Sequence, residues 1–437
     1  MPPTRPSRSL RSDVRHRELW GWAMYDFANS GYTTVVITAL FNAYFVAVVA
    51  GNAPWATFAW TAALSLSYGL VVLSAPLLGA YADLHAAKKK LLGFTTAGCV
   101  LFTALLYFAR AETLPFAILC VVASNYFFAS GENLIAAFLP ELARTRALGR
   151  VSGWGWSLGY VGGMVSLGAC LAYITWAQGQ GRTAEQFVGE SMLITAAIFA
   201  LASLPTFLLL RERAKPSAVR GPTAWRRVGR TLRNLKQFAD LRRFLWCSLF
   251  YQAGIQAVIT LAAVYAQQAL GFTTQQTLLL ILVVNLTAAG GAFAFGLLQD
   301  RIGHVRAIAL TLAGWIVTVL LAWASHGPGL FWVAANCAGL CMGASQSAGR
   351  AMVGVLTPPS RGGEFFGLWG LAVKLASVAG PLTYGTATWI SGGDHRQALL
   401  VTGLYFVVGL LLLGGVDTER GRRAALRADR VTRQEAG

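Results

Sequence analysis

Four ionisable side chains lie inside apolar stretches that are long enough to cross a membrane: Asp26, Glu132, Arg350 and Lys374. A charge at the centre of a bilayer costs about 2.5 kcal/mol or more, and such charges persist mostly where they pair or line a water-filled path. Both acids lie in the N-terminal half of the chain and both bases in the C-terminal half. Pairing between the halves would therefore neutralise the whole set. The pattern indicates a path for a charged solute or a coupling ion.

The composition is typical of a membrane protein. Of the 437 residues, 55% are hydrophobic and 12% are charged, whereas soluble domains average about 25% charged residues. Apolar segments of helix length occur at 20–50, 57–82, 90–109, 113–140, 151–176, 190–210, 243–267, 275–299, 306–325, 329–357, 364–390 and 397–416. Each can span a hydrocarbon core, which needs about 20 residues. The sequence thus predicts an all-α membrane protein of about twelve transmembrane helices.

The 36 basic residues are divided unevenly between the two sides of such a bundle. Only Arg110, Arg182 and Arg396 fall on one side, and almost all the others fall on the opposite side. Because Lys and Arg accumulate in cytoplasmic loops, we expect both termini and the long central loop in the cytoplasm. The net charge of +18 then reflects membrane topology and not nucleic-acid binding.

No residues with the spacing of a catalytic or metal site are evident. The five histidines fall in loops or near helix ends without forming a cluster, and the six cysteines lie in apolar spans without metal-ligand spacing. The sequence contains no Gly-x-x-x-x-Gly-Lys-Ser/Thr phosphate loop. We therefore expect neither an enzyme nor a bound cofactor or metal.

The chain contains an internal repeat. A short polar motif after the second apolar segment returns after the eighth, 217 residues later. Its residues are Gly79 and Asp83 in the first copy, and Gly296, Asp300, Arg301 and Arg306 in the second. Transporters are often built from two related halves, so we expect two pseudo-symmetric six-helix bundles. The predicted organisation is a basic N-terminus (1–19), a first bundle (20–210), a basic linker (211–242), a second bundle (243–416) and a basic tail (417–437).

The linker and the tail are both rich in arginine. Between Trp225 and Phe238 the linker could form an amphipathic helix, with Trp225, Val228, Leu232, Leu235 and Phe238 on one face. Such a helix would lie at anionic headgroups, and a solvated linker is the alternative. For the tail we expect a short surface helix or a disordered segment.

The second copy of the motif, 296–306, resembles the cytoplasmic loop signature of the major facilitator superfamily. The first copy departs from it at Leu84, where the signature usually has Arg. A narrower resemblance covers 22–32, 346–350 and 363–367, together with Pro358, Lys374 and Pro381. These segments are similar to the vacuolar amino-acid effluxer family (autophagy-related permeases) and its bacterial relatives. The resemblance implies a facilitator fold whose first, fourth, seventh and tenth helices line a central cavity. It also implies loop aspartates that meet helix ends across the cytoplasmic face and favour an outward-open state.

Candidate substrate or coupling-ion residues follow from this arrangement. Glu132 and Arg350 occupy matching repeat positions, and we hypothesise that they pair, directly or through a neighbour, as an inner gate, with a permanent strut as the alternative. Asp26 could bind a coupling proton, bind an ammonium group or serve structure, whereas Lys374 could bind an anionic group or neutralise Asp26 or Glu132. The polar companions are Asn29, Tyr32, Asn133, Gln252 and Gln346. They could bind a zwitterion or simply join membrane helices.

We therefore expect a secondary transporter that moves a small solute by alternating access, with amino-acid efflux and a coupling proton as the favoured form. The alternatives are an importer of larger amphipathic cargo, such as a siderophore or a cell-wall fragment, and a membrane sensor or scaffold that transports nothing. The partners expected are a small molecule, a proton and the lipid bilayer. We expect a monomer in a bacterial cytoplasmic membrane.

Overall fold

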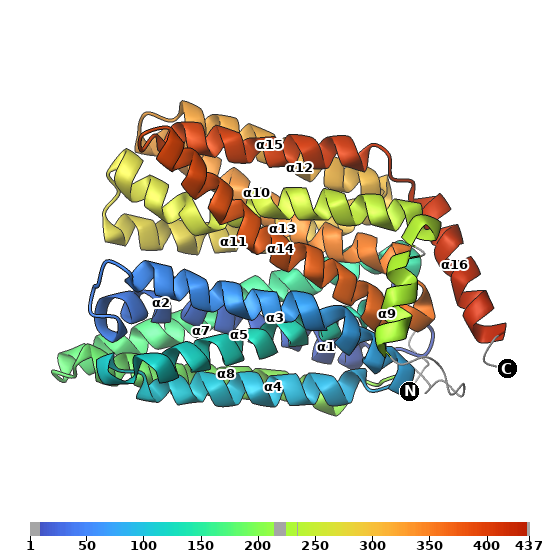
Figure 1. Cartoon of the computed structure of the whole chain (residues 1–437), viewed down its shortest axis with the longest axis horizontal. Coiled ribbons are helices and arrows are strands. Elements are labelled where there is room, and N and C mark those ends of the chain that lie inside the picture. Colours follow the sequence, from blue (N-terminus) through green and yellow to red (C-terminus); the bar gives the residue numbers. More distant parts are fainter. Residues whose placement is uncertain (1–8, 214–223, 234, 435–437) are drawn as a thin grey trace, which may run out of the picture.

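The computed structural model describes residues 9–213, 224–233 and 235–434. The described residues form helices joined by short turns and loops, with a single β-bridge between Leu10 and Ala143. Two groups of long helices lie side by side, one formed by the first half of the chain and one by the second (Figure 1). Both predicted bundles are thus present, while the exact domain boundaries remain predictions.

The N-terminal half begins with a composite span, His16–Val49. It runs through α1 (His16–Tyr32), α2 (Phe41–Tyr44) and two π-helical stretches, Thr33–Ala39 and Phe45–Val49. The following helices are α3 (Ala56–His85), α4 (Lys88–Leu105), α5 (Leu114–Ala136), α6 (Leu139–Leu142), α7 (Leu148–Gly179) and α8 (Ala184–Leu209). The predicted segment 113–140 is divided between α5 and α6, because Pro140 cannot donate the backbone hydrogen bond that a continuous helix would need.

The C-terminal half repeats the order. Its helices are α10 (Ala239–Leu270), α11 (Thr274–Ile302), α12 (His304–Ala324), α13 (Pro328–Leu356), α14 (Gly362–Ile390) and α15 (His395–Leu413). Ten helical segments of the described chain are long and apolar enough to cross a membrane. α10 and α13, with 32 and 29 residues, are also long enough at a rise of about 1.5 Å per residue. The prediction of about twelve spans is confirmed.

The halves meet along two equivalent helix pairs, α3 with α14 and α7 with α11. Glycine permits the close approach in both. A Cβ on Gly79 would lie 2.0 Å from the carbonyl oxygen of Gly363 on α14, and a Cβ on Gly296 would lie 2.8 Å from that of Gly149 on α7. Small residues let helix backbones approach closely in membranes. The repeated motif glycines are therefore contact points between the halves.

The first and the last described residues lie at the same end of the molecule, which we call the termini end (Figure 1). Two further helices lie there, α9 (Ala224–Arg233) and α16 (Thr418–Gln434). The amphipathic linker helix predicted for 225–238 is therefore shorter, and the chain continues as a 3₁₀ turn at Leu235–Phe238. The predicted face was wrong in one respect, since Trp225 is 73% exposed while Val228 and Phe238 are buried. The expected side of the membrane for this end remains a prediction.

Candidate transport site and gate

Arg350 of α13 reaches into the N-terminal half and binds Asp26 of α1. Its Nη1 donates to both carboxylate oxygens of Asp26, at 3.0 and 2.8 Å. Its Nε and Nη2 donate to the hydroxyl and the carbonyl oxygen of Ser152 on α7, at 3.1 and 2.9 Å. The side chains of Arg350 and Asp26 are 4% and 11% exposed. A buried guanidinium with this many acceptors is rigidly held.

Aromatic rings complete the surroundings of Arg350. Its guanidinium carbon lies 4.8 Å from the ring centroid of Trp22 and 5.5 Å from that of Trp156, which is cation–π distance. The indole nitrogen of Trp22 donates to the carbonyl oxygen of Ile135 at 3.0 Å, which fixes that ring. Gly155 leaves the necessary room, since a Cβ there would lie 2.3 Å from Asp26 Oδ2.

Glu132 of α5 does not pair with Arg350. The hypothesis of a direct Glu132–Arg350 gate was wrong. The guanidinium of Arg350 binds the carboxylate of Asp26 on α1, and Glu132 binds Lys374 on α14 instead. Lys374 Nζ donates to Glu132 Oε2 at 3.1 Å, and it lies 5.5 and 5.8 Å from the ring centroids of Tyr68 and Phe128. Both acids thus pair with a base of the other half, as the distribution of signs indicated.

The two ion pairs differ in exposure and in the number of contacts. Glu132 holds its partner through a single hydrogen bond, and its side chain is 33% exposed while that of Lys374 is 9% exposed. Since its partner lies on α14, the bound oxygen of Glu132 points toward the other half. This pair can exchange its partners more easily than the enclosed Asp26–Arg350 pair.

The five polar companions have different surroundings. Gln252 and Gln346 bind each other within the C-terminal half through reciprocal amide hydrogen bonds of 2.8 and 3.3 Å. Tyr32 is fully buried in the N-terminal half, where its hydroxyl lies 2.8 Å from that of Ser124. Asn133 reaches across the interface, since a Cβ on Gly370 would lie 2.1 Å from its Oδ1. Asn29 is buried, and its Oδ1 has no hydrogen-bond partner among the described residues.

The motif aspartates cap helices of the opposite half. Asp83, at the end of α3, accepts from the backbone N–H groups of Gly363 and Glu364 in the first turn of α14, both at 2.9 Å. Asp300, at the end of α11, accepts from those of Gly149 and Arg150 in the first turn of α7, at 3.0 and 3.1 Å. The N-terminus of a helix attracts anions because its N–H groups are unpaired and its dipole is positive there. The same kind of contact therefore joins the two halves at the termini end in two places.

The basic residues of the motif lie elsewhere. Arg301 and Arg306 are exposed, and neither forms an ion pair with a described residue. The candidate residues did not include Glu364, whose carboxylate is 0% exposed and binds Arg227, Thr231 and Arg361. They did not include Ser152 and Trp156 either. The position of Glu364 inside the segment 363–367, which resembles the effluxer family, was a usable signal, whereas no sequence feature marks Ser152 as an arginine ligand.

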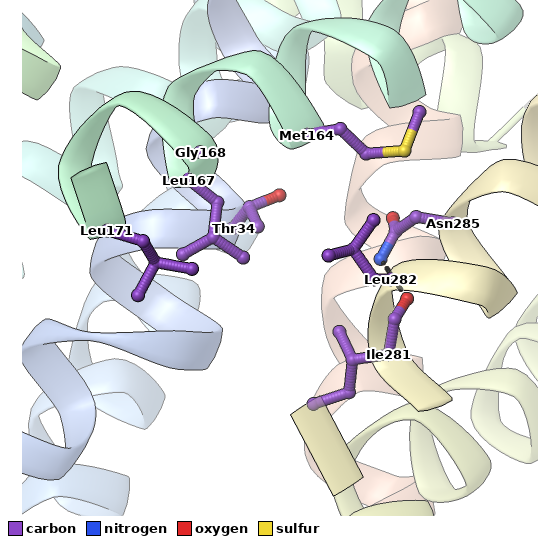
Figure 2. Close-up of a pocket in the computed structure, with 8 residues that line it drawn as sticks. All are labelled: Thr34, Met164, Leu167, Gly168, Leu171, Ile281, Leu282 and Asn285. Carbon is purple, nitrogen blue, oxygen red and sulfur yellow. Dashed lines mark hydrogen bonds between the residues drawn. The ribbon is translucent and has the colours of Figure 1, made fainter. Parts of the chain in front are cut away.

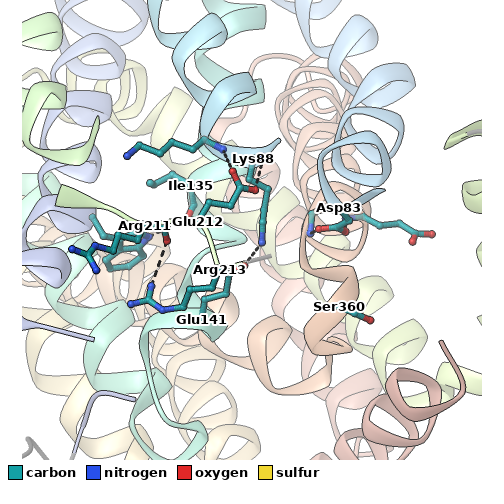
Figure 3. A network of polar contacts seen from close by, with 12 residues as sticks. Asp83, Lys88, Ile135, Glu141, Arg211, Glu212, Arg213 and Ser360 are labelled. Atoms are coloured by element: carbon teal, nitrogen blue, oxygen red, sulfur yellow. Dashed lines mark hydrogen bonds and ion pairs between the residues drawn. The ribbon is translucent and has the colours of Figure 1, made fainter. Parts of the chain in front are cut away.

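A second polar network joins segments of the N-terminal half at the termini end (Figure 3). Lys88, which is 2% exposed, binds the carboxylate of Glu141. Glu212 accepts from the backbone N–H groups of Lys88 and Lys89 at 2.8 and 3.0 Å. Arg213 binds Glu18 at 2.6 Å and also Asp13, whose pKa it lowers. This network anchors the start of the linker to the N-terminal half.

A small cavity of about 40 Å³ lies between the halves, away from the termini end. It is bounded by side chains of α7 and α11 and by Thr34, and its walls are mostly apolar (Figure 2). No three His, Cys, Asp or Glu side chains come together as a metal site within the described residues.

Comparison with known proteins identifies the family. The model for "Vacuole effluxer Atg22 like" proteins matches residues 45–426. The MFS-type transporter YxiO of Bacillus subtilis is 26% identical over 91% of this chain and 94% of its own length. Autophagy-related protein 22 of Cryptococcus neoformans is 26% identical over 65% of this chain and 56% of that protein.

The fold also matches solved structures. The human organic anion transporter MFSD10 superimposes with a TM-score of 0.72 at 17% identity, over 91% of this chain and 99% of the other. At that identity the likeness concerns the fold alone, which is the two-bundle fold of the major facilitator superfamily. Together with the family match over most of the chain, it shows that this multi-pass membrane protein belongs to the Atg22-like family of major facilitator transporters.

Proposed function

We propose that this transporter exports amino acids or closely related small solutes from the cytoplasm, with a proton as the coupling ion. The description of its family as vacuole effluxers supports the direction. The positive-inside distribution supports a cytoplasmic termini end, and the bacterial relative supports the cytoplasmic membrane as its location. The proposed functional unit is a monomer.

The observation that carries the proposal is the pair of ion bridges between the halves, Asp26–Arg350 and Glu132–Lys374. Together with both aspartate caps, they join the halves from the interior to the termini end. Alternating access requires the halves to separate at that end, so these contacts must break in each cycle. A scaffold that transports nothing has no need of buried charges that must separate.

The two pairs receive different roles in this proposal. Asp26–Arg350 is the inner gate, because it is enclosed and makes several contacts. Glu132–Lys374 receives the solute, because it is partly exposed and held by one hydrogen bond. The ammonium group of an amino acid can replace Lys374 at Glu132, while its carboxylate binds the released Lys374. A zwitterion therefore satisfies both charges when the pair opens.

Proton coupling is assigned to Asp26. When Arg350 withdraws, the carboxylate remains among apolar and aromatic groups without its cation, and desolvation disfavours its charged form. Uptake of a proton neutralises it at that stage. The return of Arg350 favours the charged form again and releases the proton.

Transport in liposomes tests the proposal. The purified protein should exchange radiolabelled amino acids, and an imposed pH gradient should accelerate net flux. Asp26→Asn should remove the response to the gradient, while Glu132→Gln should weaken solute binding at any pH. Glu190→Gln, which alters a pair with Arg182 whose side chains are 30% and 36% exposed, is the control. If the wild type moves no amino acid, the assignment of cargo is refuted, and siderophores and cell-wall fragments become the next panel.

A further inference from the structure

The linker helix α9 lies across the ends of the long helices. Figure 1 shows it almost perpendicular to the bundle at the termini end, where it packs against α3 of the N-terminal half. A helix in this orientation lies parallel to the membrane plane, near the level at which the spans leave the bilayer. Its two long faces therefore meet different environments.

The inner face of α9 is bound to Glu364, a residue of the cap that Asp83 forms between the halves. Arg227 Nε donates to Glu364 Oε2 at 3.1 Å, and the hydroxyl of Thr231 donates to the other oxygen of the same carboxylate. Val228, which follows Arg227 and lies one turn before Thr231, is 8% exposed. The backbone N–H of Glu364 is one of the two that bind Asp83 of α3. A single residue of α14 thus holds both the linker helix and the cap between the halves.

The outer face of α9 carries charge that no described acid neutralises. Arg226, Arg230 and Arg233 follow one another at i, i+4 and i+7, which places them on one side of the helix, and all three are exposed. The helix contains no acidic residue. Trp225, beside this face, is 73% exposed, and tryptophan is typical of the interface between lipid and water.

We propose that the outer face of α9 binds the phosphodiester headgroups of anionic phospholipids, and that this contact holds the two halves together at the termini end, where Asp83 caps α14. Lipid on the arginines keeps α9 parallel to the membrane and pressed against α3. Its inner face then keeps Glu364 in place as a partner of Asp83. Because α9 contacts α3 and is bound to α14, the gate opens only when one of these attachments is released.

The test measures how lipid composition changes gate opening, and it requires no knowledge of the cargo. Ala136, at the end of α5, is 1% exposed among residues of the C-terminal half, so Ala136→Cys is a reporter of opening. It is placed in the full chain with the native cysteines replaced, in nanodiscs of phosphatidylcholine with or without phosphatidylglycerol. The rate of modification by a water-soluble maleimide is measured.

We expect phosphatidylglycerol to slow modification several-fold. The triple variant R226Q/R230Q/R233Q should lose this dependence on lipid and react at the faster rate in both membranes. The control R422Q/R427Q/R430Q removes the same charge from exposed positions of α16. It should keep the dependence, because the main contacts of α16 are with α10, α13 and the turns at Leu235–Phe238 and Pro359–Arg361. Thermal unfolding of each variant verifies that it is folded.

Three results would overturn the proposal. The first is an equal dependence on phosphatidylglycerol in the wild type and the α9 variant. The second is a loss of dependence in the α16 control as large as in the α9 variant, which would indicate a diffuse effect of net charge. The third is equal slowing by millimolar inorganic phosphate in pure phosphatidylcholine, which would make a soluble anion the ligand.

Discussion

Replacing Asp26 by Asn removes the charge that faces Arg350 and leaves that guanidinium buried. Removing one partner of a buried ion pair costs about 3–5 kcal/mol. The lower value, about 3 kcal/mol, is appropriate because an asparagine oxygen can still accept one hydrogen bond and Ser152 retains its two. In the open state Arg350 is hydrated and Asp26 is neutralised by its proton, so an asparagine in place of Asp26 costs little there. At about 1.4 kcal/mol per factor of ten, the open population should rise on the order of 100-fold.

Modification of Ala136→Cys by a water-soluble maleimide reports this population. In the Asp26→Asn background the rate should rise by about the same factor as the open population, provided that opening is faster than the reaction. Glu190→Gln should change the rate little, since exposed ion pairs contribute about 0–1 kcal/mol. A second variant, Asp26→Asn with Arg350→Gln, should recover most of the slow rate, because it no longer buries an unpaired charge.

An unchanged rate in a folded Asp26→Asn protein would refute the assignment of this pair as a closing contact. A double variant that opens as readily as the single one would refute the electrostatic reason, and would indicate that the packing of the arginine is what matters. Arg350→Lys further separates the electrostatic explanation from the packing explanation, because lysine keeps the charge but cannot bind both carboxylate oxygens in the same geometry.

Three further predictions concern neighbouring contacts. Gly155→Ala places a methyl group 2.3 Å from a carboxylate oxygen of the gate pair, so the reporter cysteine should react faster although no charge has changed. Asp83→Asn and Asp300→Asn each weaken one cap at a helix N-terminus, worth about 0.3–2 kcal/mol, and each should raise the reaction rate several-fold. Gln252→Leu leaves Gln346 without its buried amide partner, so the melting temperature should fall by an amount corresponding to about 1–3 kcal/mol, with little change in the reporter rate.

The sequence alone determined the features that depend on local pattern. Each span is a continuous apolar run, and each motif aspartate follows its span directly, so the helix count and the repeat could be read without a structure. The opposite signs of Asp26 and Glu132 against Arg350 and Lys374 also required pairing between the halves, because an unpaired charge in a membrane is costly. The candidate residues were therefore found as a set.

The tertiary structure decided which partners meet. Arg350 binds Asp26 and not Glu132 because of what α7 places beside α1. Gly155 has no side chain and so leaves room for the guanidinium, and the hydroxyl and carbonyl oxygens of Ser152 accept hydrogen bonds from it. That choice depends on the rotation and spacing of three helices far apart in the chain, and no local pattern encodes it. Similarly, Glu364 binds the linker helix only because α9 crosses the ends of both bundles. Periodicity reports the face of one helix, whereas partner choice is set by how several helices pack together.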